Sequence, residues 1–348
     1  MFFRMRRRNA DPIRSQHRAR APMAMALAAM LYGNATAQTW WKPAPKDHLS
    51  WQWQIGAAPA TNVLLNVDMY DVDLEGIPKA TIDEMHKRGI KAVCYFSAGT
   101  YEGWRGDWKN FFPFIGEADY PGTEKPFLGK MADWDERWLD VREIDLLKPI
   151  MTARLKAAKA TGCDAVEPDN MDAYANLPEV KPVGALTAAH QLAYNRAIAK
   201  WAHDEGLSVA LKNDVGQLDD LVGDCDWALN EQCYEFGECG GYDVFIKAGK
   251  AVFGVEYQGD TASFCGKART AQMSWLKKKL DLGAFREACN EGRALTAIGA
   301  IGEMPRPRGR IRQAAANPAP DRDGLGRVRM DDAQIRKFPA PEARSALH

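Results

Sequence analysis

Three acidic side chains, Glu167, Asp169 and Asp172, lie at the end of a short apolar run in the middle of the sequence. Pro168 has no N–H group to give to a sheet, so we expect a strand to end there, with the acids at its end and in the following loop. Glu167 and Asp169 would then point the same way, and Asn170 the opposite way. Like charges held together raise each other's pKa, so such a cluster is costly. A solvated acidic loop or a calcium site is the plain alternative.

Polar and aromatic side chains recur at the ends of the other apolar runs. One acid at a strand end is usually a helix cap or a loop residue. Many strand ends that carry acids and aromatic residues together indicate a binding site for a sugar ring. Aromatic side chains stack on the C–H face of a sugar, and carboxylates bind its hydroxyl groups. The candidates, in chain order, are Asp68, Asp71, Asp73, Tyr95, Ser97, Lys212, Asn213, Asp214, Asn230, Glu231, Glu256 and Tyr257.

Asp169 and Glu231 are the two carboxylates that we expect to face each other across the mouth of the fold. Glycoside hydrolysis needs such a pair, one acting as nucleophile or base and the other protonating the leaving oxygen. Lys212 lies between them in the sequence and would stabilise the anionic form of Asp169, or form only a structural ion pair. No cation is expected beside Glu231. A site in which Glu167, Asp169 and Asp172 bind a divalent metal is a weaker alternative.

The elements that must position these residues alternate between apolar runs and helical stretches. Eight strands are expected to begin near residues 51, 63, 91, 164, 208, 227, 252 and 274, and helices over 79–87, 145–160 and 188–205. This alternation and length favour a (β/α)8 barrel. Residues 57–62 are too few for a crossover helix, so a doubly wound open sheet stays possible, although no G-x-G-x-x-G follows a strand. Residues 99–135 are expected to be irregular.

The two ends of the sequence differ in composition from the middle. Residues 1–37 combine seven arginines, a short apolar run and a small-x-small site before Gln38, which predicts a secretory signal peptide cleaved after Ala37. Residues 38–50 are expected to be a linker and residues 51–290 the barrel. Residues 291–348 lose periodicity and are rich in Arg, Pro and Ala, which predicts a disordered tail. Residues 38–290 carry 28 basic and 38 acidic residues, a net charge of about −10, which argues against a nucleic-acid partner.

The seven cysteines fit an exported chain, because disulfides persist outside the cytosol. We expect bridges between Cys233 and Cys239 and between Cys265 and Cys289. Residues 94 and 163 lie in apolar contexts and are expected to be plain buried thiols. The odd count leaves at least one cysteine free, and zinc is disfavoured because no C-x-x-C pair exists and histidine is scarce.

Several of these motifs together resemble glycoside hydrolase family 114. They are W-Q-W-Q at 51–54, D-V-D at 71–73, C-Y-F-S-A-G at 94–99, W-L-D-V-R at 138–142, E-P-D-N at 167–170, L-K-N at 211–213 and N-E-Q-C at 230–233. The resemblance covers about residues 50–289. It implies a TIM-barrel endo-α-1,4-polygalactosaminidase that acts with retention, with Asp169 as nucleophile and Glu231 as acid/base, about 5–5.5 Å apart. Asp172 is kept as a rival nucleophile.

The sequence therefore predicts an exported glycosidase of galactosamine or N-acetylgalactosamine polysaccharide. We expect it to be a monomer without cofactor, metal or membrane span in the mature chain. Its expected substrate-binding residues are Asp71, Tyr95, Ser97, Asn170, Lys212, Asn213 and Tyr257. A carbohydrate-binding barrel without catalysis, or a divalent-metal hydrolase, remains the alternative.

Overall fold

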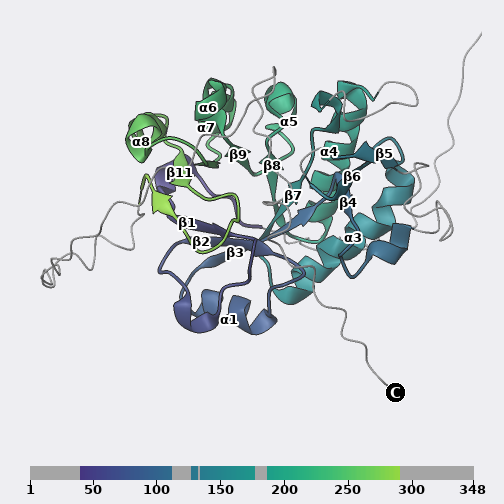
Figure 1. The fold of residues 1–348 in the computed structure, drawn as a ribbon, viewed down its shortest axis with the longest axis horizontal. Coiled ribbons are helices and arrows are strands. Elements are labelled where there is room, and N and C mark those ends of the chain that lie inside the picture. The colour runs from purple at the N-terminus through teal and green to yellow at the C-terminus, as the bar shows by residue number, and fades with distance from the viewer. Residues whose placement is uncertain (1–39, 112–126, 132–133, 177–185, 291–348) are drawn as a thin grey trace, which may run out of the picture. The chain divides into compact units, whose positions relative to one another are not determined.

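The computed structural model describes residues 40–111, 127–131, 134–176 and 186–290. A sheet of nine strands runs in the order β1-β2-β3-β7-β8-β9-β10-β11-β12 and curls into the predicted α/β barrel (Figure 1). All neighbours pair in parallel except β11 and β12. The strands are β1 (Trp51–Gln54), β2 (Met69–Asp73), β3 (Lys91–Ser97), β7 (Ala165–Asp169), β8 (Ser208–Lys212), β9 (Trp227–Glu231), β10 (Val252–Glu256), β11 (Ser274–Lys277) and β12 (Glu287–Ala288).

Helices surround the outer face of this sheet (Figure 1). Gly162 ends α3 with a φ of 105°, a conformation that glycine adopts without strain and that turns the chain into β7. The α-helices are α1 (Lys79–Lys87), α3 (Ile144–Thr161), α4 (Ala188–Asp204), α5 (Leu218–Leu221), α6 (Cys233–Phe236), α7 (Asp243–Lys247) and α8 (Thr261–Thr270). Short 3-10 turns cover Pro45–Asp47, Thr61–Val63, Trp108–Phe111, Ala173–Ala175, Val215–Gln217 and Cys239–Tyr242.

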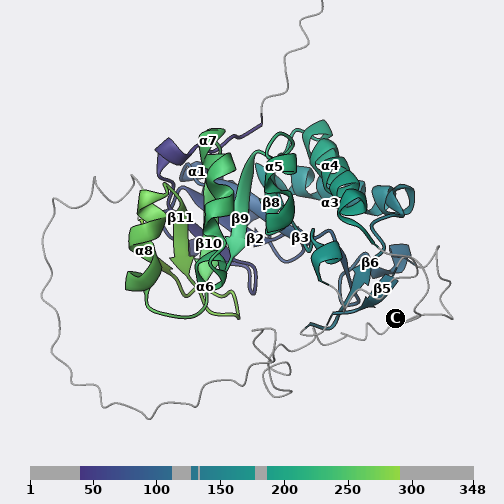
Figure 2. The same ribbon diagram turned by 90° about the horizontal axis from the view of Figure 1, so that it is seen from above.

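A second, antiparallel sheet is inserted between β3 and α3. It consists of β4 (Thr100–Glu102), β5 (Phe127–Lys130) and β6 (Glu136–Leu139) in the order β4-β6-β5, and it lies to one side of the parallel sheet (Figure 2). We had expected residues 99–135 to be irregular, but their described part contains β4 and β5. The strands were missed because each has only three or four residues, too few for a clear alternation.

The predicted second strand was wrong by several residues. The apolar run at 63–68 is mostly loop, and the strand is β2, Met69–Asp73. Asp71 and Asp73 therefore belong to the strand itself. The shift also removes the difficulty of the short join, because 14 residues now connect β1 to the parallel β2.

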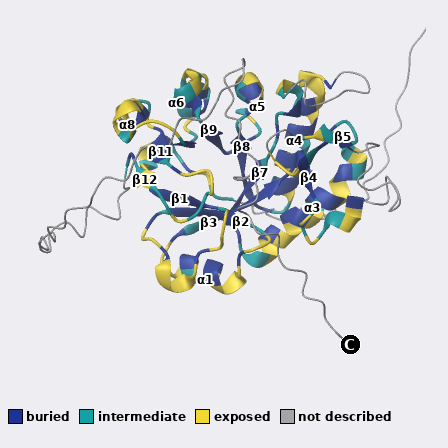
Figure 3. Cartoon of the chain, in the orientation of Figure 1, coloured by how far each residue is buried: buried dark blue, intermediate teal, exposed yellow. Residues whose placement is uncertain are grey.

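Alternate residues of the strands enter two separate apolar clusters. One set fills the inside of the barrel, with Trp51, Met69, Val93, Ala165 and Phe253 among its members. The other faces the helices and contains Tyr70, Cys94, Val166 and Val209. Buried residues accordingly line the strands on both faces, and exposed residues lie on the outer sides of the helices (Figure 3). This two-sided burial is typical of parallel sheets.

Three disulfides hold the barrel together. Cys233–Cys239 and Cys265–Cys289 form as predicted. Cys94 and Cys163, expected to be plain thiols, form a third bridge instead, because the pairing of β3 with β7 brings the two residues together. Cys225 is buried and free.

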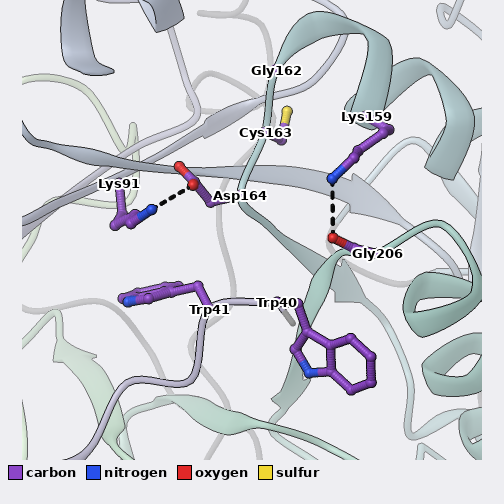
Figure 4. A pocket seen from close by; sticks show the side chains of 8 residues that line it. All are labelled: Trp40, Trp41, Lys91, Lys159, Gly162, Cys163, Asp164 and Gly206. Carbon is purple, nitrogen blue, oxygen red and sulfur yellow. Dashed lines mark hydrogen bonds and ion pairs between the residues drawn. The ribbon is translucent and has the colours of Figure 1, made fainter. Parts of the chain in front are cut away.

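The amino ends of the strands open on a cavity of about 400 Å³ (Figure 4). Trp40 and Trp41 line it together with Lys91, Asp164 and the loops before β7 and β8. The Trp40 ring already packs against other side chains. It stacks on the His203 ring with 4.1 Å between the centroids, and its centroid lies 4.9 Å from the Lys42 ammonium. We therefore interpret these tryptophans as the base of the barrel rather than as a sugar platform. The part of the predicted linker that is described, from residue 40, packs against this base.

No helix of the described residues is long and apolar enough to cross a membrane. The predicted signal peptide, its cleavage site and the predicted tail lie outside the described residues.

Candidate active site

Lys212, the last residue of β8, forms the centre of a cluster at the carboxyl ends of the strands. Its Nζ lies 2.8 Å from Glu167 Oε1, 3.0 Å from Asp169 Oδ1 and 3.2 Å from Glu231 Oε2. The Lys212 side chain is 1% exposed, whereas Asp169 and Glu231 are 17% and 25% exposed. Burial alone would lower the pKa of Lys212, but the three carboxylates together raise it well above its usual value. The lysine is thus a fixed ammonium beneath two carboxylates that reach the solvent.

Asp169 ends β7, one residue beyond the predicted strand end. Pro168 is tolerated because the ladder from β7 to β8 stops at Val166, so no hydrogen bond is missing on that side. The Asp169 carbonyl accepts hydrogen bonds from the backbone N–H groups of Ala98 and Gly99, at 2.9 and 3.0 Å. Its carboxylate accepts from Lys212 and, at 3.1 Å, from the Tyr95 hydroxyl. Four donors therefore fix this residue.

Asn170 follows in a left-handed conformation, with a φ of 60°. Its Nδ2 donates to Ser97 Oγ at 2.9 Å and to Thr100 Oγ1 at 3.1 Å, and lies 3.5 Å from Glu136 Oε2. Thr100 also donates to Glu136, which comes from β6 of the small sheet. Burial, and next the charge of Glu102, raise the pKa of Glu136 to about 8. Thr100 and Glu136 of the small sheet thus fix Asn170, the residue that follows Asp169.

Gly99 permits this close approach. A Cβ at position 99 would lie 1.6 Å from the Asn170 carbonyl oxygen, which no side chain can tolerate.

Glu231, at the end of β9, is held by two groups besides Lys212. Tyr257 donates its hydroxyl to Glu231 Oε1, and Asn213 Nδ2 donates to Oε2 at 3.3 Å. Asn213 also accepts the Glu231 backbone N–H at 2.9 Å. The expectation that Glu231 has no cation beside it was wrong, because Lys212 is shared by Asp169 and Glu231.

Glu167 and Asp71 lie deeper than this pair, and both side chains are completely buried. Glu167 accepts hydrogen bonds from Lys212 and, at 3.0 Å, from Trp53 Nε1. Among the described residues, no N–H or O–H group donates to either oxygen of Asp71. The predicted role of Asp71 in substrate binding is difficult to reconcile with this burial.

Asp172 belongs to a separate acidic cluster beside the mouth. Burial, and next the charge of Asp169, raise its pKa to about 6, and Asn176 Nδ2 donates to it at 3.1 Å. Burial and then Asp172 raise the pKa of Asp214 to about 8. Asp214 accepts from Tyr174 at 3.1 Å and from Asn195 at 2.8 Å. Asp172 has no direct contact with Lys212 among the described hydrogen bonds and ion pairs, so its surroundings differ from those of Asp169.

The structure brings most of the predicted site residues together. Asp169, Glu231, Lys212, Tyr95, Asn213 and Tyr257 form one network, while Ser97 and Asn170 support the loop behind it. Glu256 does not face this network, because its carboxylate accepts the Tyr234 N–H. Asn230 lies at its edge: its Nδ2 donates to Asn213 Oδ1 at 3.4 Å, and its Oδ1 accepts the Cys233 N–H. Sequence reasoning missed Trp53, whose place in the alternating W-Q-W-Q run could have indicated it, and Glu136, which no signal marked.

The geometry constrains the possible chemistry. Asp169 Oδ1 and Glu231 Oε2 lie 3.0 and 3.2 Å from Lys212 Nζ. The distance between the two oxygens therefore cannot exceed the total of these two distances. Two partly exposed carboxylates with different hydrogen-bond partners, at the carboxyl ends of barrel strands, can serve as nucleophile and acid. Lys212 occupies the place between Glu167 and Asp169 where a metal would bind. No cluster of three or more His, Cys, Asp or Glu suited to a metal occurs among the described residues.

Several known proteins are similar to this chain. The model of glycoside-hydrolase family GH114 matches residues 32–294. Among solved structures, Aspergillus fumigatus Ega3 in complex with galactosamine is similar, with 32% identity, a TM-score of 0.62 and coverage of 72% of this chain and 97% of that one. The glycoside hydrolase domain of PelA from Pseudomonas aeruginosa shares the fold, with 13% identity, a TM-score of 0.52 and coverage of 69% and 98%. No curated protein matches the chain significantly.

Proposed function

Because the chain belongs to glycoside hydrolase family GH114 and is a glycosidase, we propose that it hydrolyses α-1,4-linked galactosamine or N-acetylgalactosamine polysaccharide with retention. Two observations support this substrate. The similar Ega3 structure was solved with galactosamine. The acidic body of the chain suits a cationic aminosugar polymer.

The observation that carries the mechanism is that Asp169 and Glu231 share Lys212. An inverting pair must be roughly 6.5–9.5 Å apart to admit a water between acid and base, whereas a retaining pair needs about 5–5.5 Å. The two lysine distances, 3.0 and 3.2 Å, set an upper limit below the inverting range for the oxygens that face Lys212. This favours direct attack by one carboxylate on the sugar.

In the proposed first step, Asp169 attacks the anomeric carbon while the glycosidic bond breaks. Glu231 gives its proton to the leaving oxygen, so the departing sugar leaves as a neutral alcohol. In the second step Glu231 takes a proton from water, and the resulting hydroxide displaces Asp169 from the anomeric carbon. Lys212 and Tyr95 hold Asp169 Oδ1 and Oδ2 in place, while Tyr257 and Asn213 orient Glu231.

Export is part of the proposal. The basic, apolar and small-residue order of residues 1–37 is that of a signal peptide, and three disulfides suit an oxidising compartment. A carbohydrate-binding barrel without catalysis is the second candidate, although a complete carboxylate pair at the mouth gives no reason to expect inactivity.

Product analysis tests the proposal. The protein is incubated with galactosamine-containing polymers of defined acetylation, and the products are read by mass spectrometry, with the anomer formed first determined by NMR. Short oligomers released as the α-anomer are expected. Binding without release would leave only the second candidate, and release of the β-anomer would exclude retention.

A further inference from the structure

The cluster around Lys212 contains more carboxyl groups than cations. Three carboxylates contact this one ammonium, and the buried Asp71 carboxyl lies against one of them, Glu167. Glu231 holds the proton that it gives up in the proposed first step, which still leaves three negative charges around one positive charge, and like charges and burial both favour a further protonation. We therefore expect one of Glu167, Asp169 and Asp71 to hold a proton as well.

The hydrogen-bond donors indicate which group this is. Glu167 accepts from Lys212 and Trp53, Asp169 from Lys212 and Tyr95, and Glu231 from Asn213 and Tyr257. The bonds to Glu167 and Asp169 suit ionised carboxylates, whereas Glu231 carries the proton of the general acid. Among the described residues, none donates to Asp71, and the carboxyl group that acts on it most strongly is Glu167, which itself accepts from Lys212 and Trp53. Two acceptors can join only through a proton, and the group without any other donor is the one that must supply it.

We propose that Asp71 is a neutral carboxylic acid in the working enzyme and donates a hydrogen bond to Glu167, which makes it a positioning residue for Lys212. The bond fixes Glu167 as an anion beneath the ammonium, and Glu167 in turn holds Lys212 where it can serve both Asp169 and Glu231. Asp71 is completely buried and acts through this chain of contacts, not on the sugar.

The surroundings of Asp71 agree with this role. Its neighbours in register are Trp53 on β1 and Val93 on β3, and the charged groups near it are Glu167 and Asp169 on β7 and Lys212 on β8. Burial, and next the charge of Glu167, raise the pKa of Asp71 well above its usual value, with Lys212 opposing them. These influences favour the protonated form of Asp71, and its loss of the proton would add a buried negative charge that loosens the cluster.

Asp71→Asn is the decisive variant, because an amide can donate the same hydrogen bond but cannot ionise. Asp71→Ala removes the donor, and Asp73→Asn, two residues along the same strand, replaces an aspartate that is paired with Arg105 at 2.6 Å. Infrared difference spectra between wild type and each variant are recorded, and kcat and KM on a soluble galactosamine oligomer are measured across pH. The kinetic part rests on the proposed function, whereas the spectra do not.

The wild-type spectrum should contain a carboxylic-acid C=O band that Asp71→Asn removes and Asp73→Asn keeps. Asp71→Asn should retain kcat within about threefold and extend activity to higher pH, while Asp71→Ala should lower kcat by ~10- to 100-fold with little change in KM, the usual loss for a hydrogen bond to a charged group. If the band survives in Asp71→Asn, or if Asp71→Asn is as slow as Asp71→Ala, the inference is overturned. If the wild type releases no product, the proposed function fails and the band alone decides.

Discussion

The two ends of β7 each carry an aspartate with a lysine partner, yet the two pairs differ in kind. Asp164, just before the strand, binds Lys91 at 2.7 Å, and Asp169, at its end, binds Lys212 at 3.0 Å. The Lys91 side chain is 43% exposed and Lys212 is 1% exposed. Asp164 has its lysine to itself, whereas Lys212 is divided among three carboxylates. A lysine beside an aspartate therefore does not by itself identify the candidate active site. The burial of Lys212 and its contacts with three carboxylates distinguish that site from the Lys91–Asp164 pair.

The electrostatics of the two ends differ in the same way. Burial would raise the pKa of Asp164, but Lys91, the Ala92 N–H and His86 lower it below its usual value. All the donors around Asp164 thus serve one carboxylate and stabilise the fold. At the other end the donors are spread over carboxylates that remain partly exposed, which leaves those groups able to react.

The largest difference is expected between Asp169→Asn and Asp164→Asn. Loss of the nucleophile should reduce kcat by about four orders of magnitude or more and abolish the glycosyl-enzyme adduct. Asp164→Asn should leave kcat unchanged, since it is at the far end of the strand. Rates and intact-protein mass spectra measure both. If Asp172→Asn is inactive while Asp169→Asn is not, the nucleophile is Asp172, and if neither loses activity the carboxylate-pair mechanism is wrong.

Glu231→Gln should come next, with a loss of ~10²- to 10⁴-fold on the natural polymer, the range for a general acid–base group. An aryl glycoside with a good leaving group needs little protonation, so its glycosylation step should be slowed much less. Rates on both substrates, measured with Asn213→Ala as a control that keeps the carboxyl group, test this. An equal loss on both substrates would argue against the acid role.

The two lysines should differ in their effects on stability. Lys212→Met removes the cation from a cluster that includes the buried Glu167 carboxylate and should lower the free energy of unfolding by about 3–5 kcal/mol. Lys91→Met removes a half-exposed pair and should cost ~0–1 kcal/mol. Urea denaturation of the oxidised proteins provides both values. Similar losses for the two variants would remove the distinction between the two ends.

The pH dependence of stability should have opposite signs for Asp164 and Asp172. The lowered pKa of Asp164 means that it contributes stability above its unfolded pKa, which is lost as the pH falls. The pKa of Asp172 is raised from 3.8 to about 6, so the folded state binds the extra proton, and stability falls as the pH rises from about 4 to 6. At pH 7, Asp172→Asn should therefore gain up to ~1 kcal/mol, and Asp164→Asn should lose a similar amount. Denaturation at pH 4 and pH 7 checks both signs, and a loss for Asp172→Asn at pH 7 would contradict the assignment.

Truncation after Asn290 should have the smallest effect. The composition of residues 291–348 predicts that they do not contribute to the barrel, so the melting temperature should change by less than the few degrees that correspond to ~1 kcal/mol. Differential scanning calorimetry of the full and shortened chains is sufficient. A larger drop would show that the tail stabilises the barrel and that the comparison of its two ends is incomplete.

The sequence predicted the barrel and the positions of Asp169 and Glu231 at the carboxyl ends of its strands because these depend on local patterns. Residues 79–87 were recognised as a helix at both bounds, with Gly89 in a left-handed conformation after it. Strand β2 was misplaced because Asp71 and Asp73 point inward, where the usual alternation requires apolar residues. The Cys94–Cys163 bridge was missed because it depends on the register between β3 and β7, which one sequence does not reveal. Glu136 was missed for a similar reason, because only the folding of the inserted sheet brings it next to Asn170.

The Cys94–Cys163 bridge closes a covalent ring of chain that includes β4, β5, β6 and α3. A protease that cuts one peptide bond inside this ring would release no fragment, because the bridge still joins the two new ends of the molecule. Tyr95 and Asp169 flank the bridge on β3 and β7, so their pairing would survive the cut even if the inserted sheet came apart. The bridge thus keeps β3 and β7 covalently joined after such a cut, whereas the contact of Glu136 with Asn170 depends on the inserted sheet.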